Sequence, residues 1–146
     1  MSRLVVALGV VCLMAAVAVA AVAVAADRVA PPSGAEVYFI APQNGAKVHS
    51  PVTVKFGLKG LGIAPAGVKF DNTGHHHLLV DTDLSELKLE APMPATDKIV
   101  HFGKGQTETT LTLTPGKHTL QLIFADYLHQ SFDPTMTSKK ITITVE

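Results

Sequence analysis

The sequence predicts an all-β fold: a single immunoglobulin-like Greek-key β-sandwich of about seven strands, preceded by an N-terminal signal helix. Short segments rich in β-branched and aromatic residues recur along the chain, and Gly, Pro and Asn turns separate them. Beyond the N-terminal segment the chain is almost free of helical patterns. Short strands at regular intervals are typical of a sandwich. A cupredoxin-like sandwich, which has a similar length and strand number, is the alternative.

The N-terminus predicts export. A short basic start, Ser2-Arg3, precedes an apolar run from Leu4 to Ala26, and Ala23-Val24-Ala25 is a small-x-small cleavage pattern. We therefore expect a signal peptide over residues 1–26 and a periplasmic or secreted protein. An uncleaved anchor is the alternative, because the run is long enough to cross a bilayer, and membrane contact is expected only through that segment. The only cysteine, Cys12, lies in this run, so the mature chain lacks disulfides and thiolate ligands.

The remainder of the chain suits one domain. Residues 27–34, with Pro31-Pro32-Ser33-Gly34, are expected to form a linker, and residues 35–146 the β-sandwich. The whole chain has 12 basic and 12 acidic residues and no basic stripe, which argues against a nucleic-acid partner. It also has no glycine-rich phosphate-binding loop.

Seven strands are expected, each bounded by turn residues. They are residues 36–40, 52–58, 75–80, 98–102, 106–113, 118–126 and 140–145. Pro42-Gln43-Asn44-Gly45 ends the first strand, because Asn-Gly favours a turn with positive φ. The second strand alternates cleanly, with every second side chain directed toward the core: Val52, Val54, Phe56 and Leu58. The third carries three consecutive histidines.

The later strands follow a less regular stretch. Residues 81–97 are expected to hold one short helical turn, and we interpret them mainly as a crossover between sheets. Gly103-Lys104-Gly105 closes the fourth strand, and Thr114-Pro115-Gly116-Lys117 leads into the most apolar strand. In the last strand Ile141, Ile143 and Val145 are expected to face the core.

Chemistry is suggested only by the histidines. Side chains alternate along a strand, so His75 and His77 share one face, while His76 lies on the other face with Leu78 and Val80. Two imidazoles two residues apart on one face form half of a metal site, because neutral imidazole is the commonest protein metal ligand. We expect His76 to be packed and hydrogen-bonded at the core edge.

The metal hypothesis uses His75 and His77, joined by His101 and by His129 or Asp126. Nitrogen and oxygen ligands would suit copper or zinc. The alternative is that these histidines bond carbonyls and hydroxyls at the sandwich edge, or face solvent. His118 is expected to be structural, with its ring bridging backbone at a corner, and His49 to be exposed.

Two further readings carry less weight. Met93 and Met136 could offer thioethers to copper(I), although simple packing is the alternative. A His101 base oriented by Asp126 or Asp81 would be needed for catalysis, but no serine stands in a nucleophile-elbow setting and no paired carboxylates are evident. We therefore expect the protein not to be an enzyme.

Three motifs carry a resemblance to a known family. They are Gly74-His75-His76-His77-Leu78-Leu79-Val80-Asp81, His101-Phe102-Gly103-Lys104-Gly105-Gln106-Thr107-Glu108 and Pro115-Gly116-Lys117-His118-Thr119-Leu120-Gln121-Leu122. Together they resemble a family of bacterial secreted domains catalogued as domain of unknown function 4399, over residues 35–146. The resemblance implies a small exported β-domain with a histidine-rich middle, without an established activity. The family often shows D-H-x-H-x-P-H after the penultimate strand, where this chain has Tyr127, His129 and Phe132.

These observations predict an exported, non-catalytic β-sandwich that serves as a binding or accessory module of the bacterial cell envelope, with an unknown envelope partner. The alternative is a periplasmic copper- or zinc-binding protein that uses a cluster of His75, His77 and His101, with His129 as a further ligand.

Overall fold

The computed structural model describes residues 27–146, and the predicted signal peptide, residues 1–26, lies outside this part. Within residues 27–146 the chain forms nine strands and one short 3₁₀ turn. The fold is all-β, as the turn-punctuated strand pattern predicted. No helix in this part of the chain is long and apolar enough to cross a membrane.

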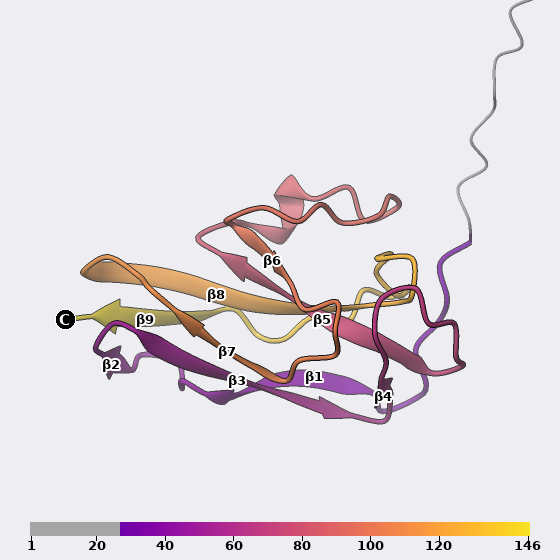
Figure 1. Cartoon of the computed structure of the whole chain (residues 1–146), viewed down its shortest axis with the longest axis horizontal. Coiled ribbons are helices and arrows are strands. Elements are labelled where there is room, and N and C mark those ends of the chain that lie inside the picture. The colour runs from indigo at the N-terminus through magenta and orange to yellow at the C-terminus, as the bar shows by residue number, and fades with distance from the viewer. Residues whose placement is uncertain (1–26) are drawn as a thin grey trace, which may run out of the picture.

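Two sheets pack face to face (Figure 1). The smaller sheet has the order β1–β3–β7, and all its pairings are antiparallel. Its strands are β1 (Glu36–Ala41), β3 (Val52–Lys59) and β7 (Glu108–Leu111). Alternation along β3 buries Val52, Val54 and Phe56 and leaves the intervening residues exposed, because one face of this sheet meets the core and the other meets water.

The larger sheet has the order β2–β9–β8–β5–β4, with β6 also paired to β5. Its strands are β2 (Lys47–Val48), β4 (Gly62–Ile63), β5 (Thr73–Val80), β6 (Ile99–His101), β8 (Gly116–Ala125) and β9 (Ile141–Val145). The short strands β2 and β4 pair in parallel at the two edges and are not foreseen by the sequence pattern. The other seven strands correspond to the seven predicted segments.

The main core lies between the sheets. It combines the inward residues of both sheets: Val54, Phe56, Leu78, Val80, Leu120, Leu122, Phe124 and Ile143, among others. His76 joins this core, as the alternation along β5 predicts, and its ring lies 5.1 Å from that of Phe56 and 5.0 Å from that of Phe124. Its ring interacts with the backbone of Gly57, although neither ring nitrogen makes a hydrogen bond of regular geometry.

A second, smaller core covers the outer face of the larger sheet. It contains Leu79 of β5, Ile123 and Ala125 of β8, Ile99 of β6 and Met93. The segment between β5 and β6, which includes the 3₁₀ turn η1 (Leu84–Glu86), lies over this face (Figure 1). Strand β5 is consequently buried on both sides, with His75, His76 and His77 all fully buried. The prediction that this irregular segment crosses between the sheets is wrong, because β5 and β6 pair within the larger sheet, and the segment instead covers the outer face of that sheet.

Candidate metal centre

Strand pairing places three histidines together on the covered outer face. His77 of β5 is directly opposite His101 in the antiparallel pairing with β6. His75 precedes His77 by two residues and therefore shares its face. The ring centroids of His75, His77 and His101 are 4.9–5.0 Å apart. The cluster thus arises from a side-chain alternation and one cross-strand pair.

The fourth predicted ligand, His129, enters from the loop after β8. The centroid of its ring lies 4.7 Å from His101, 5.0 Å from His75 and 6.0 Å from His77. His129 has a φ of 64°, in the left-handed region that few residues other than glycine adopt. Such backbone strain persists only where the surroundings hold it, and it concentrates at functional sites.

Asp126 holds this loop in place. Its carboxylate Oδ1 accepts hydrogen bonds from the backbone N–H groups of Leu128 (2.8 Å) and Gln130 (3.0 Å). The backbone N–H of His129 donates to the Asp126 carbonyl (3.0 Å), and its own carbonyl accepts from the N–H of Met93 (2.9 Å). Asp126, which the sequence offers as a ligand or as an orienter of His101, shapes the His129 loop through its Oδ1.

The nitrogens of the cluster lack ordinary partners. Both ring nitrogens of His75 and of His77, and Nε2 of His101, are buried without any hydrogen bond in the described part of the chain. An unpaired buried polar group costs about 1–3 kcal/mol, so five such nitrogens in one place are costly for a purely structural arrangement. His75 and His77 therefore neither bond carbonyls and hydroxyls nor face solvent, whereas His101 is half-buried.

The electrostatics keep these rings neutral. Burial, together with the neighbouring histidines, lowers the pKa of His75 to about 4 and that of His77 to about 2. Burial and the proximity of His129 also lower the pKa of His101. A neutral imidazole keeps a free lone pair, which is the form that binds a metal ion.

The spacing is close to that of a coordination shell. One ligating atom from each of His75, His77 and His101 lies within 4.8 Å of the others. Atoms so spaced share a point no more than about 2.8 Å from each of them, whereas zinc–nitrogen bonds measure about 2.0–2.1 Å. Ring rotations that move each ligating nitrogen by one ångström or less would therefore close the shell.

Gly103, which sequence reasoning did not single out, makes room for His101. A Cβ atom at Gly103 would lie 2.3 Å from Cε1 and 2.6 Å from Nε2 of the His101 ring. Only glycine therefore leaves the ring in its present position. The one available signal was the Gly103-Lys104-Gly105 turn directly after the histidine.

The remaining histidines lie elsewhere. His118 bonds the Asp81 carboxylate through Nδ1 (2.7 Å) and the Thr114 carbonyl through Nε2 (2.8 Å), which is the structural corner role expected for it. His49 is exposed, as expected.

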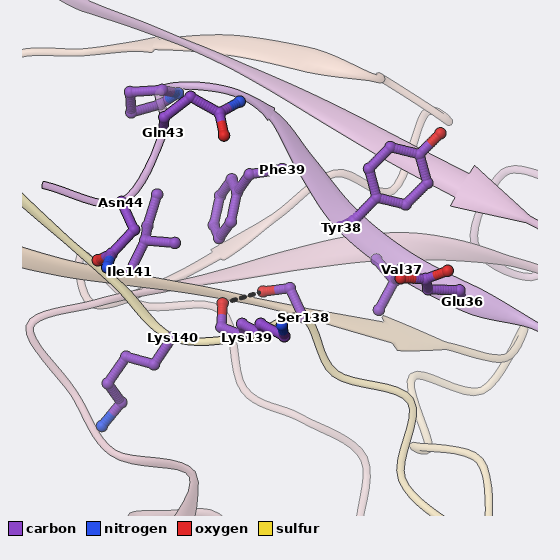
Figure 2. Close-up of a pocket in the computed structure, with 11 residues that line it drawn as sticks. Glu36, Val37, Tyr38, Phe39, Gln43, Asn44, Ser138, Lys139, Lys140 and Ile141 are labelled. Carbon is purple, nitrogen blue, oxygen red and sulfur yellow. Dashed lines mark hydrogen bonds between the residues drawn. The ribbon is translucent and has the colours of Figure 1, made fainter. Parts of the chain in front are cut away.

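A groove of about 300 Å³ between β1 and the segment before β9 is unrelated to the cluster (Figure 2). It includes Glu36, Tyr38 and Lys140, and none of the predicted site residues. The hydroxyl of Ser138, which borders the groove, donates to the Lys139 carbonyl (2.8 Å) and accepts from the Leu122 N–H (2.9 Å). The hydroxyl of Ser138 is thus fully occupied by backbone hydrogen bonds, and we assign no chemistry to this groove.

The fold and the cluster define a small β-sandwich domain with four histidines gathered on a covered sheet face. A family model described as "Domain of unknown function (DUF4399)" matches residues 54–146, which include all four histidines, and the chain belongs to this family. No curated protein and no solved structure matches the chain significantly.

Tyr127 and Phe132, where the resemblance led us to expect histidines, lie outside the cluster. Phe132 is buried in the main core, where its ring stacks 6.2 Å from that of Phe124. Tyr127 lies beneath the ammonium group of Lys69, at 5.6 Å. The replacement of histidine at these two positions therefore removes no ring from the group of His75, His77, His101 and His129.

Proposed function

We propose that this protein is an exported, non-catalytic β-sandwich module of the bacterial cell envelope that binds one copper or zinc ion. His75, His77 and His101 are the primary ligands, and His129 supplies the fourth. The observation that supports this proposal most strongly is that His75, His77 and His101 bring one ring nitrogen each within 4.8 Å of the others, while five nitrogens of these rings are buried without a partner in residues 27–146. A bound cation would accept the lone pair of one nitrogen from each of the three rings, and so supply a partner that residues 27–146 do not provide.

A binding role is favoured over a catalytic one by the surroundings of His101. A catalytic base needs a hydrogen-bonded partner that orients it, and Nε2 of His101 has none in residues 27–146. Asp126 and Asp81, which were the conceivable partners, bond the loop backbone and His118 respectively. Export rests on the sequence of residues 1–26.

Metal content and affinity test the proposal. The tag-free full-length precursor is expressed, and the exported protein is purified without chelating resin and titrated with copper(II) and with zinc. We expect one ion per chain with a Kd below about 1 μM, and a loss of at least about 100-fold in affinity on changing His77 to alanine. His49→Gln, which changes an exposed histidine, is the matched control and should bind like the wild type.

Two results would overturn the proposal. One is binding of both ions no tighter than millimolar by the wild-type protein. The other is an equal affinity of the wild type and His77→Ala, since the ion would then be held at a different place on the protein.

A further inference from the structure

The cluster is unusual in that it carries no negative charge. The group of ligating atoms that the structure brings within 4.8 Å contains three histidines and no carboxylate in residues 27–146. Oδ1 of the nearby Asp126 already accepts two backbone hydrogen bonds. The only cysteine, Cys12, lies in the predicted signal peptide. An ion bound here would therefore keep its full formal charge.

The charge of the ion then determines the free energy of transferring it from water into the site. The free energy of transferring an ion from water into a region of low dielectric constant grows with the square of its charge, so a divalent ion is penalised about four times as heavily as a monovalent one. His75 and His77 are fully buried, and Leu79, Ile123 and Ala125 lie on the same sheet face. His101 and His129 are half-buried, so the site is largely but not wholly removed from water, and with neutral ligands it favours a monovalent ion.

A methionine also lies in the small core on the histidine face. Of the two methionines in the described part of the chain, Met136 lies in the main core and Met93 lies in the small core on the histidine face. The N–H of Met93 donates to the carbonyl of His129, which fixes its backbone beside the cluster. Thioethers are soft ligands that select copper(I) over zinc and copper(II).

From these two observations we propose that the physiological ion is copper(I), and that the thioether of Met93 takes the fourth ligand position, in place of His129, beside His75, His77 and His101. The inference rests on the proposed function and narrows it from copper or zinc to one ion. The protein binds the ion in its reduced form, and no electron transfer within the protein is required.

Competition measurements test the choice of ion. Copper(I), prepared anaerobically with excess ascorbate, is competed against bathocuproine disulfonate, and zinc against a chromophoric chelator. The wild-type protein should hold copper(I) at least about 100-fold more tightly than zinc. Met93→Leu should weaken copper(I) binding about tenfold and change zinc binding less than about twofold, because only the thioether is lost.

Met136→Leu is the matched control. Both methionines are buried, each with 6% of its surface exposed, and leucine conserves their volume. Met136→Leu should leave both affinities unchanged. A second variant, His129→Asp, adds a carboxylate at a position whose left-handed backbone aspartate tolerates, and should lower the ratio of copper(I) to zinc affinity about tenfold.

The outcomes separate this inference from the proposed function. Zinc held as tightly as copper(I) would overturn the inference and leave the metal-binding function intact. Equal copper(I) affinities for Met93→Leu and Met136→Leu would overturn the role of Met93. If neither ion bound at micromolar concentration, the proposed function itself would fail.

Discussion

His76 and His77 are neighbours in sequence and lie in opposite environments. His76 packs between Phe56 and Phe124 inside the sandwich, whereas His77 faces the other histidines on the outer side of the same sheet. Both are fully buried, and within residues 27–146 neither has a hydrogen bond of regular geometry at its ring nitrogens, although the Gly57 backbone lies close to the ring of His76. The two residues therefore incur a similar energetic cost, and only His77 belongs to the proposed metal site.

Leucine substitutions separate the effect of each buried ring on stability from its effect on metal binding. We predict that His76→Leu and His77→Leu each stabilise the metal-free protein by about 1 kcal/mol, because each removes a buried polar ring without a partner. His76→Leu should keep metal affinity, and His77→Leu should abolish it. Urea unfolding at pH 7.5 and metal titration measure the two effects. A loss of stability above about 2 kcal/mol in both variants would contradict the view that these nitrogens are unsatisfied.

Gly103 offers a second test at the scale of a single residue. Because a Cβ atom there would overlap the His101 ring, Gly103→Ala should displace that ring while leaving the strand intact. We expect metal affinity to fall about tenfold or more and thermal stability to change by only a few degrees. Lys104→Ala, at the exposed neighbouring position, should change neither quantity. Unchanged affinity in Gly103→Ala would show that His101 is not a ligand.

At the scale of the element, the loop that carries His129 depends on one carboxylate. Asp126→Ala removes the acceptor for two backbone N–H groups, which should cost about 1–3 kcal/mol of stability and release His129 from its strained conformation. Metal affinity should fall several-fold. Asp126→Asn keeps an acceptor oxygen and should restore most of both losses. Calorimetry and titration provide the comparison. Equal behaviour of the alanine and asparagine variants would contradict this role.

The strands themselves could be predicted from the sequence, and their surroundings could not. Alternation along the third predicted strand separated His76 from His75 and His77, and the structure confirms that separation. The meeting of His77 and His101 depends on the register between β5 and β6, which alternation alone does not determine. The full burial of His75 and His77 depends on the segment between these strands, whose irregular sequence gave no sign that it would cover the sheet.

The edge strands β2 and β4 and the conformation of the loop after β8 could also not be predicted from the sequence pattern. Strands β2 and β4 have two residues each, too few to show any periodicity. The placement of His129 depends on hydrogen bonds between the loop and Met93, which are far apart in sequence. Sequence spacing could therefore nominate the four histidines, but only the fold could place them together.

At the scale of the whole molecule, the buried histidines predict a pH dependence of stability. Folding lowers the pKa of His75 and His76 from 6.5 to about 4, and that of His77 to about 2, in each case mainly through burial. Below pH 6.5 the unfolded chain therefore binds protons that the folded chain does not. Stability is full above pH 6.5 and falls as the pH decreases toward the folded pKa values, by about 1.4 kcal/mol per pH unit for each histidine.

We accordingly expect the metal-free protein to lose most of its stability between pH 6.5 and pH 4, since a slope of about 4 kcal/mol per pH unit soon matches the total stability of a small domain. His118 acts in the opposite direction, because its bond to Asp81 raises its pKa, and its contribution is present below pH 6.5 and lost above that raised value. Denaturant unfolding over a pH series measures the summed effect of these histidines on the free energy of unfolding. His77→Leu should reduce the slope of that free energy against pH. A constant free energy of unfolding from pH 7 to pH 5 would contradict the burial of neutral rings.

The most direct test of the central claim is X-ray absorption spectroscopy of the protein loaded with one equivalent of metal. Imidazole rings give a characteristic multiple-scattering pattern, so the ligands can be counted. The cluster predicts a shell with three or four imidazole nitrogens at about 2.0 Å. A shell dominated by oxygen, with at most one imidazole, would contradict the assignment of His75, His77 and His101 as ligands.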